Sequence, residues 1–156
     1  MEGESSRHHI VVDTNLIISG VIAPTGNPYA LLQAWRRDEV ALITSSEIIA
    51  EVERVLHKPR LRQRYGLTNE QIQDVVNELQ SGAIQAVPLS SLPIQSRDPN
   101  DDMFLAVALG AAATFLVSGD NDLLSLKGAP ELGELRIVIV REFLDLLAET
   151  GDTPLD

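Results

Sequence analysis

The sequence predicts an α/β domain of three layers, α/β/α, with about five mainly parallel strands. Short apolar runs rich in β-branched residues alternate along the chain with longer segments whose apolar residues recur at helical spacing. The strand-like runs, such as "VALIT" at 40–44, are apolar almost throughout, as strands covered by helices on both faces are. Right-handed crossovers limit the arrangements, although the sequence leaves the order of the strands open.

The first part of the chain is expected to contain two strands and two longer helices. Strands are predicted at 8–13 and 40–44. Asn27 and Pro28 suit the N-cap and the first position of a helix. Serines suited to capping begin "SSEIIAEVERVL" at 45–56, whose apolar residues form a helical stripe.

The middle of the chain is expected to hold two more helices and one strand. A short helix is predicted from Pro59 to near Gly66. Thr68 and Gln71 stand in the two positions of a capping box, which predicts the start of the next helix. A strand is expected around 84–88.

The last third of the chain repeats the alternation of helix and strand. The motif "DPNDD" at 98–102 predicts the start of a helix that runs to about Ala112. The apolar runs at 114–118 and 136–140 predict strands, and "EFLDLLAE" at 142–149 predicts a closing helix.

Length and composition indicate one acidic domain. The 156 residues suffice for a single core, which we place at 8–149 between flexible ends at 1–7 and 150–156. The formal net charge of −11 repels nucleic acids and anionic membranes, so contact with RNA requires a local basic patch or bridging metal ions. The absence of cysteine excludes thiol catalysis, disulfides and cysteine-based zinc sites, and it fits a reducing compartment.

No segment has the character of a membrane span or a secretory signal. The apolar runs are shorter than the ~18 residues of a spanning helix, and the N-terminus lacks the three regions of a signal peptide. We therefore expect a cytoplasmic protein without membrane contact.

Acidic residues collect where the predicted strands end. In an open α/β sheet, ligands bind beyond the carboxyl ends of the strands. Asp13 ends the first strand, and "SGDND" at 118–122 follows a later one. Glu51 lies at the border of its helix's apolar stripe, from which it can face the same end of the sheet. The acids expected near that edge are Asp13, Glu51, Asp101, Asp102, Asp120 and Asp122.

Each of these acids also has a purely structural explanation. Asp13 suits the cap of a following helix. Asp98 suits another cap, in which Asp101 would complete the box and favour the helix dipole. Glu51 suits a solvated helix face, and "GDND" suits a tight turn. The shared position of the acids, rather than any one of them, favours a functional site.

A group of carboxylates has a definite chemistry. Carboxylates brought together repel one another and raise one another's pKa, so a cation stabilises the group. Oxygen ligands without cysteine or paired histidine favour Mg²⁺ or Mn²⁺. Such a site activates water and stabilises an in-line phosphoryl displacement. The residues therefore predict hydrolysis of a phosphodiester.

Four motifs, taken in order, resemble a PIN domain, the metal-dependent ribonuclease fold found in VapC-type toxins. They are "VVDTN", "SEIIAEVERVL", "DPNDDMFLAVA" and "FLVSGDNDLL", and the resemblance covers roughly residues 9–145. The last two are similar to a bacterial and archaeal group described as toxin components of toxin–antitoxin systems. The resemblance implies a PIN-like fold and a Mg²⁺- or Mn²⁺-dependent endoribonuclease that pairs with an antitoxin and forms a homodimer.

The resemblance also assigns roles to residues. Its metal-binding and catalytic carboxylates fall on Asp13, Glu51, Asp101 and Asp120, with Asp122 just behind the last. Supporting polar positions fall on Thr14, Asn15 and Ser118. Asp102 is the alternative to Asp101 if the register shifts by one residue.

Basic residues concentrate in one segment, "RVLHKPRLRQR" at 54–64. It contains no acid, and we expect the RNA backbone or an acidic antitoxin segment to bind there; the alternative is a solvated helix with weak surface ion pairs. Tyr29 and Trp35 support a homodimer, unless they pack in the core. The proposed RNA-binding residues are Arg54, Lys58, Arg60, Arg62 and Arg64.

Other functions fit the residues less well or stay open beside this one. The D-x-D of haloacid dehalogenase-like proteins is broken by Asn15. A response-regulator receiver needs a lysine near its last strand, and Lys127 comes too early. A non-catalytic interaction module and a housekeeping RNA-processing nuclease, both of the PIN-like fold, stay open as alternatives.

Overall fold

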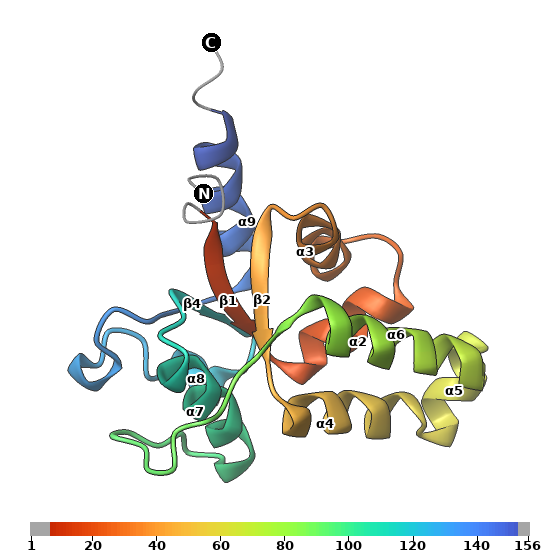
Figure 1. Ribbon diagram of the computed structural model, residues 1–156, viewed down its shortest axis with the longest axis horizontal. Coiled ribbons are helices and arrows are strands. Elements are labelled where there is room, and N and C mark those ends of the chain that lie inside the picture. Colours follow the sequence, from red (N-terminus) through yellow and green to blue (C-terminus); the bar gives the residue numbers. More distant parts are fainter. Residues whose placement is uncertain (1–6, 153–156) are drawn as a thin grey trace.

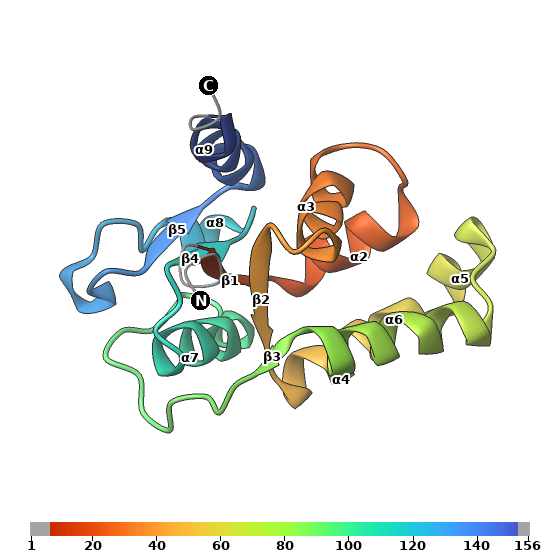
Figure 2. The same ribbon diagram turned by 45° about the horizontal axis from the view of Figure 1, so that its top comes forward.

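The computed structural model describes residues 7–152 and contains a five-stranded parallel sheet in the order β3-β2-β1-β4-β5. Figure 1 labels its central strands β1, β2 and β4, and Figure 2 labels all five. Each neighbouring pair of strands is parallel, which confirms the predicted α/β fold and the strand number. The strands are β1 (His8–Val12), β2 (Val40–Thr44), β3 (Ile84–Gln85), β4 (Phe115–Val117) and β5 (Arg136–Val138).

Helices cover both faces of the sheet. Right-handed crossovers from β1 to β2 and β3 place their helices on one face, and the return to β4 places α7 on the other, as Figure 2 shows. The helices are α2 (Thr14–Ile22), α3 (Asn27–Arg36), α4 (Ser46–Leu56), α5 (Pro59–Tyr65), α6 (Asn69–Gly82), α7 (Asp102–Gly110), α8 (Asn121–Leu124) and α9 (Val140–Asp152), with 3₁₀ turns η1 (Pro99–Asp101) and η2 (Pro130–Leu132).

The central strands form the core. All five residues of β2 are buried, and the last three of β1 are almost wholly so, as a sheet covered on both faces requires. Trp35 is also buried and donates its Nε1–H to the Gly82 carbonyl at 3.3 Å. Trp35 therefore packs in the core and gives no support to a dimer interface.

The strand order reverses at β1, and a crevice forms at this point of the sheet. The segments that follow β1 and β4 turn to opposite faces of the sheet, which opens the crevice at the carboxyl ends of these strands. Val12 pairs with Val117 in the register of the two strands. Asp13 and Ser118, which follow them, are thereby brought together from 105 residues apart.

Several predicted boundaries need correction. Helix α3 begins at Asn27, so the cap is Gly26, whose φ of 97° lies in the region that favours glycine. The strand predicted at 84–88 ends at Gln85 because the chain then crosses onto α7. Gly110 permits that crossing, since a Cβ there would lie 2.8 Å from the Val87 carbonyl oxygen. Helix α7 ends at Gly110, before Ala112.

Other local predictions are confirmed or extended. Thr68 and Gln71 form both hydrogen bonds of the capping box, at 2.9 and 3.0 Å. The short helix α8, absent from the predicted elements, follows β4 after the loop at 118–120. Within the described part of the chain, no helix combines the length and the apolar character that crossing a membrane would require. Flexible ends were predicted at 1–7 and 150–156, and of these residues 1–6 and 153–156 lie outside the described part of the chain.

Candidate functional site

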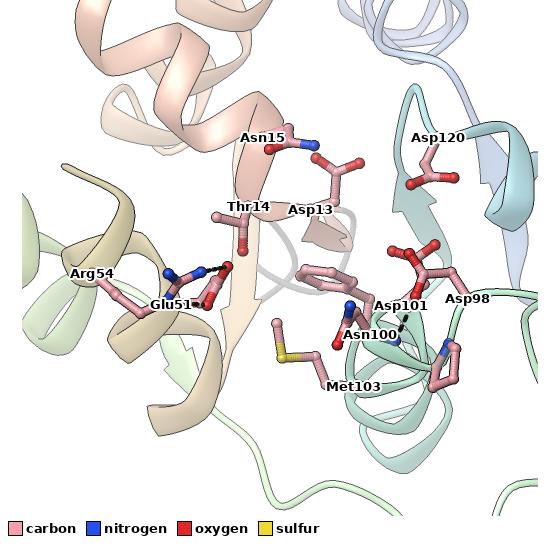
Figure 3. A pocket seen from close by; sticks show the side chains of 12 residues that line it. Asp13, Thr14, Asn15, Glu51, Arg54, Asp98, Asn100, Asp101, Met103 and Asp120 are labelled. Carbon is pink, nitrogen blue, oxygen red and sulfur yellow. Dashed lines mark hydrogen bonds and ion pairs between the residues drawn. The ribbon is translucent and has the colours of Figure 1, made fainter. Parts of the chain in front are cut away.

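A pocket of about 490 Å³ opens at the carboxyl ends of the central strands (Figure 3). It lies between the N-terminal turns of α2 and α7, the middle of α4 and the loop after β4. Its walls are formed by Asp13, Thr14, Asn15, Glu51, Arg54, Asp98, Pro99, Asn100, Asp101, Met103, Phe104 and Asp120. Five of these twelve residues are acidic.

Asp13 is held rigidly at the end of β1. One carboxylate oxygen accepts the backbone N–H of Leu16 at 2.9 Å and caps α2, and the other accepts the hydroxyl of Ser118. Burial raises the pKa of Asp13, and its hydrogen bonds to Ser118 and Leu16 offset part of that rise. The cap explanation for Asp13 is thus realised, yet the same side chain also lines the pocket.

Asp101 is a buried carboxylate whose surroundings disfavour its charged form. It lies in the 3₁₀ turn before α7, only 7% exposed, and its Oδ2 has no hydrogen-bond partner among the described residues. Burial is the largest cause, and with the neighbouring charges of Asp120, Asp98 and Asp122 it raises the pKa of Asp101 from 3.8 to about 7. A buried carboxylate oxygen without a partner is costly, so it favours a ligand at this position.

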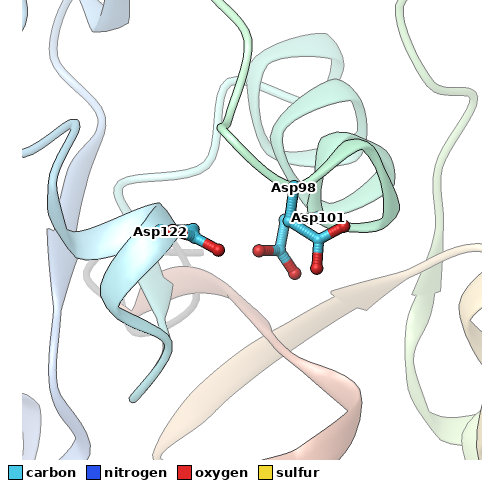
Figure 4. Close-up of side chains that lie close together, drawn as sticks. All are labelled: Asp98, Asp101 and Asp122. Atoms are coloured by element: carbon cyan, nitrogen blue, oxygen red, sulfur yellow. The ribbon is translucent and has the colours of Figure 1, made fainter.

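Asp101 also belongs to a cluster of three carboxylates with Asp98 and Asp122 (Figure 4). One oxygen from each lies within 4.8 Å of the others. Asp122 also forms an ion pair with Arg97 at 3.0 Å, which reduces the net negative charge of the cluster. Asp98 was expected only as a cap, a role that it does fill by accepting the Asn100 N–H at 3.0 Å.

Asp120 joins this acidic wall from the loop after β4. Its backbone N–H donates to the Ser118 hydroxyl at 3.0 Å, and its carboxylate accepts the Asp122 N–H at 2.7 Å. Ser118 therefore links Asp120 to Asp13, because the same hydroxyl donates to Asp13. In place of the tight turn considered for "GDND", Asp120 forms the N-cap of α8, and this cap orients two of the acids.

Glu51 projects from α4 on the other side of the pocket (Figure 3). Both of its oxygens accept hydrogen bonds from Arg54, at 3.1 and 2.7 Å, and this contact lowers the pKa of Glu51. Glu51 is outside the three-residue cluster. Thr14, which also lines the pocket, has a buried hydroxyl without a hydrogen-bond partner in the described part of the chain.

Other expected site residues lie elsewhere. Asp102 does not line the pocket; its carboxylate accepts the Ser96 N–H at 2.8 Å and ties the preceding loop to α7. Of the five basic residues in segment 54–64, Arg54 alone lines the pocket. Helix α5, with the arginines of that segment, lies beyond the C-terminal end of α4 (Figure 1).

The residues present fit a divalent cation. Asp101 Oδ2 supplies a buried anionic oxygen with no other partner among the described residues, and the surrounding ligands are oxygens of aspartate and glutamate. Hard cations such as Mg²⁺ and Mn²⁺ prefer this donor set. Burial and the repulsion of nearby carboxylates raise the pKa of Asp101, and a cation there would relieve the repulsion.

Known proteins resemble this chain in sequence and in fold. "Uncharacterized protein MJ1680" of Methanocaldococcus jannaschii is 30% identical over 124 residues, which span 80% of this chain and 78% of that protein. PAE2754 from Pyrobaculum aerophilum has a crystal structure with a TM-score of 0.54 and 16% identity, covering 96% of this chain and 94% of its own. FitAcB from Neisseria gonorrhoeae reaches 0.49 at 13% identity, over 85% of this chain and 98% of its own.

A family model described as "PIN domain" matches residues 9–122. That span runs from β1 to α8 and includes all six acids of the pocket and the adjoining cluster. PIN domains are generally nucleases that bind divalent metals, and an acidic triad is present here. The family match, together with the sequence relative and the shared fold, shows that this chain belongs to the PIN-domain family.

Proposed function

We propose that the protein is a Mg²⁺- or Mn²⁺-dependent endoribonuclease that hydrolyses RNA phosphodiester bonds as the toxin of a cytoplasmic toxin–antitoxin pair. The observation that supports it most is the buried Oδ2 of Asp101, which has no hydrogen-bond partner among residues 7–152 and is surrounded by further carboxylates in an open pocket. A structural role would leave such an oxygen paired. A cation and a phosphate would satisfy this arrangement.

The cation would be held from two sides of the pocket. Asp13, Asp101 and Asp120 offer carboxylates from the central strands and α7, and Glu51 offers one from α4. Asp98, which also lines the pocket, and Asp122 lie close to Asp101 and add negative charge. When bound, a divalent cation supplies an acidified water and positive charge against the phosphate in an in-line displacement.

The protein's own residues prepare that chemistry. Ser118 fixes the orientation of Asp13 and of the Asp120 backbone with one hydroxyl. The Leu16 N–H holds the second oxygen of Asp13, so neither carboxylate oxygen rotates freely. A preorganised carboxylate loses little conformational entropy when it binds a ligand. The Thr14 hydroxyl, which bonds to no other group in the described part of the chain, is suited to donate to a phosphate oxygen or a water.

RNA would approach through the basic segment 54–64. Arg54 reaches the pocket itself, and the arginines of α5 extend the positive charge outward along the protein. The rest of the chain carries seven basic residues against 23 acidic ones, so it repels a polyanion. This segment would therefore set the direction of approach.

The role as a toxin rests on the resemblance of "DPNDD…VSGDNDLL" to toxin components, and a homodimer rests on the same family resemblance. An adjacent small gene whose product suppresses the activity would support the toxin role. A nuclease that matures a defined cellular RNA without such an inhibitor would instead favour RNA processing. Light scattering at micromolar concentration tests the dimer, which a monomer mass would contradict.

A cleavage assay tests the nuclease function directly. The protein is incubated with a mixed RNA pool and Mg²⁺ or Mn²⁺, with and without EDTA, and the product ends are mapped. We expect cleavage within the RNA that EDTA abolishes and that added metal restores. Cleavage that persists in EDTA, or a protein that cuts no RNA in either metal, would contradict the proposal and favour a non-catalytic module.

A further inference from the structure

Arg54 is the one basic side chain among the described residues that line the pocket, and it is engaged with Glu51. Its Nε and Nη2 atoms donate to the two oxygens of the Glu51 carboxylate. The two side chains come from successive turns of α4 (Figure 3). The α4 carboxylate proposed as a metal ligand is therefore already occupied by a cation of the protein itself.

We propose that the Glu51–Arg54 pair exchanges partners when substrate binds: an RNA phosphate takes Arg54, and Glu51 becomes free to complete the metal site. This inference rests on the proposed nuclease function. Metal and RNA each withdraw one member of the same ion pair, so the binding of one favours the binding of the other. Such a coupling is reciprocal by thermodynamic necessity.

The pair is suited to exchange because it is exposed. The Glu51 side chain is 33% exposed and the Arg54 side chain 60% exposed. Exposed pairs three residues apart on a helix are screened by water and salt, and they contribute little to stability. Opening this pair therefore leaves no buried charge unpaired.

The geometry of the guanidinium favours phosphate as the new partner. A guanidinium offers two parallel N–H groups to a carboxylate, and it offers the same fork to a phosphate. Arg54 already donates two hydrogen bonds in this way. Because Arg54 lines the pocket, it can change partners without leaving the surface over which RNA would pass.

The opposite wall supplies the reason for Glu51 to move. Asp101 keeps an oxygen without a described partner, and Asp13 and Asp120 face the same space. A cation bound to these acids would attract the Glu51 carboxylate and repel the Arg54 guanidinium. Cation and phosphate thus act on the pair in the same direction.

The experiment measures metal affinity rather than catalysis. Mn²⁺ is titrated into the full chain and free Mn²⁺ is read by electron paramagnetic resonance, with and without a saturating 2′-O-methyl phosphorothioate RNA oligonucleotide, a slowly hydrolysed analogue whose integrity is checked on gels. The variants are Arg54→Lys, which keeps the charge but loses the fork, and Arg54→Gln, which loses both. Arg97→Lys and Arg97→Gln are matched controls, because Arg97 pairs with Asp122 and not with Glu51.

We expect the RNA to tighten Mn²⁺ binding to the wild-type chain by about fivefold or more, as typical couplings do. Without RNA, Arg54→Lys should bind Mn²⁺ more tightly than wild type. Lysine keeps the charge but loses the paired hydrogen bonds to Glu51, so Glu51 is released to the metal more easily. Arg54→Gln should lose most of the coupling, and both Arg97 variants should keep it. An unchanged coupling in Arg54→Gln would overturn this inference and leave the nuclease function standing. A wild-type chain that fails to bind Mn²⁺ would overturn both.

Discussion

The two walls of the pocket carry the same kind of side chain in opposite electrostatic settings. On the α7 wall, Asp101 is buried, keeps an oxygen without a described partner and has a pKa raised to about 7. On the α4 wall, Glu51 is a third exposed, is paired at both oxygens with Arg54 and has a lowered pKa. One carboxylate is destabilised by its surroundings and the other is stabilised.

The difference indicates how the site divides its work. On the α7 wall, carboxylates are buried and repel one another in the folded protein, and a bound cation would relieve this repulsion. On the α4 wall, the charge of Glu51 is already balanced by the Arg54 guanidinium. We therefore expect the α7 wall to contribute most of the cation affinity, and the α4 wall to adjust the site to substrate. Changes to either wall test this division.

The largest effect is expected from losing a carboxylate of the rigid set. Asp13→Asn and Asp101→Asn should each lower RNA cleavage by at least about a thousandfold, as losses of essential catalytic groups do. Both variants should fold, because asparagine retains the cap on α2 and removes charge that is repelled. Steady-state cleavage assays and circular dichroism provide the measurements.

Asp102→Asn is the matched control for Asp101→Asn. It changes the same atoms one residue away, but Asp102 lies outside the pocket and an amide oxygen can still accept the Ser96 N–H. Its activity should stay within a few-fold of wild type. Loss of activity in Asp102→Asn with full activity in Asp101→Asn would reverse the assignment of the two aspartates.

The buried charge on the α7 wall should appear as a pH dependence of stability. Without metal, the free energy of unfolding should fall as pH rises from about 4 through 7. The Asp101 pKa is raised from 3.8 to about 7, so over this range the folded state keeps a proton that the unfolded state has released. The contribution is present in full below the lower value, and it is lost as pH passes the upper one. At ~1.36 kcal/mol per pKa unit the shift corresponds to about 4 kcal/mol, which screening by solvent reduces.

Denaturant titrations in EDTA at several pH values, on wild type and Asp101→Asn, isolate this contribution. The difference in unfolding free energy between the two proteins should change with pH, because other titrating groups cancel. A difference that is constant from pH 4 to 8 would show that Asp101 carries no such strain.

Added metal should reverse the loss of stability at neutral pH. A site filled at 100 times its Kd gains about 2.7 kcal/mol, which for a chain of this size raises Tm by about 5–10 °C. Asp101→Asn should abolish most of the Mg²⁺-induced shift, and Glu51→Gln should keep the larger part of it. If Glu51→Gln loses more of the shift than Asp101→Asn, the proposed division between the walls is wrong.

Ser118→Ala should have a smaller effect through orientation alone. It removes the hydroxyl that donates to Asp13 and accepts from the Asp120 N–H without touching a charge. Removal of such supporting hydrogen bonds typically costs about 10–100-fold in metal affinity or activity. Ser118→Thr, which restores a hydroxyl, should recover part of the activity. Equal activity in wild type and Ser118→Ala would remove Ser118 from the site.

Much of the fold was predictable because its signals are local. The apolar run of β2 and the capping box at Thr68 are read within a few residues, and both are confirmed. The errors arise where distant contacts decide. The strand at 84–88 is cut short because the chain turns onto Gly110 of α7, and four residues of α8 are too few to show a period.

The same distinction holds for the site. Asp13, Glu51, Asp101 and Asp120 line one pocket because parallel strands end at one edge, which the alternation of elements already implies. Asp98 was missed because a cap explained it fully, and a single carboxylate can be both cap and cluster member. The choice of Asp101 over Asp102 as the residue facing the pocket depends on how a 3₁₀ turn rotates two adjacent side chains, which the sequence does not show.

The smallest expected effect concerns the arginines of α5, which follows α4 in the chain. Replacing Arg60, Arg62 and Arg64 with glutamine should raise the apparent KM for RNA about two- to tenfold. It should also lower the salt slope by up to ~0.7 for each phosphate of a single strand that these arginines bind. Their helix lies beyond the end of α4 (Figure 1). None of the three arginines lines the pocket, so kcat and the Mg²⁺-induced shift in Tm should stay unchanged.

The control is a triple variant in which Arg37, Lys127 and Arg141 become glutamine. It changes the net charge by the same amount at other places in the chain, and its salt slope should match wild type. Equal slopes in both triple variants would show that net charge alone matters, and that the arginines of α5 form a solvated face without a part in RNA binding.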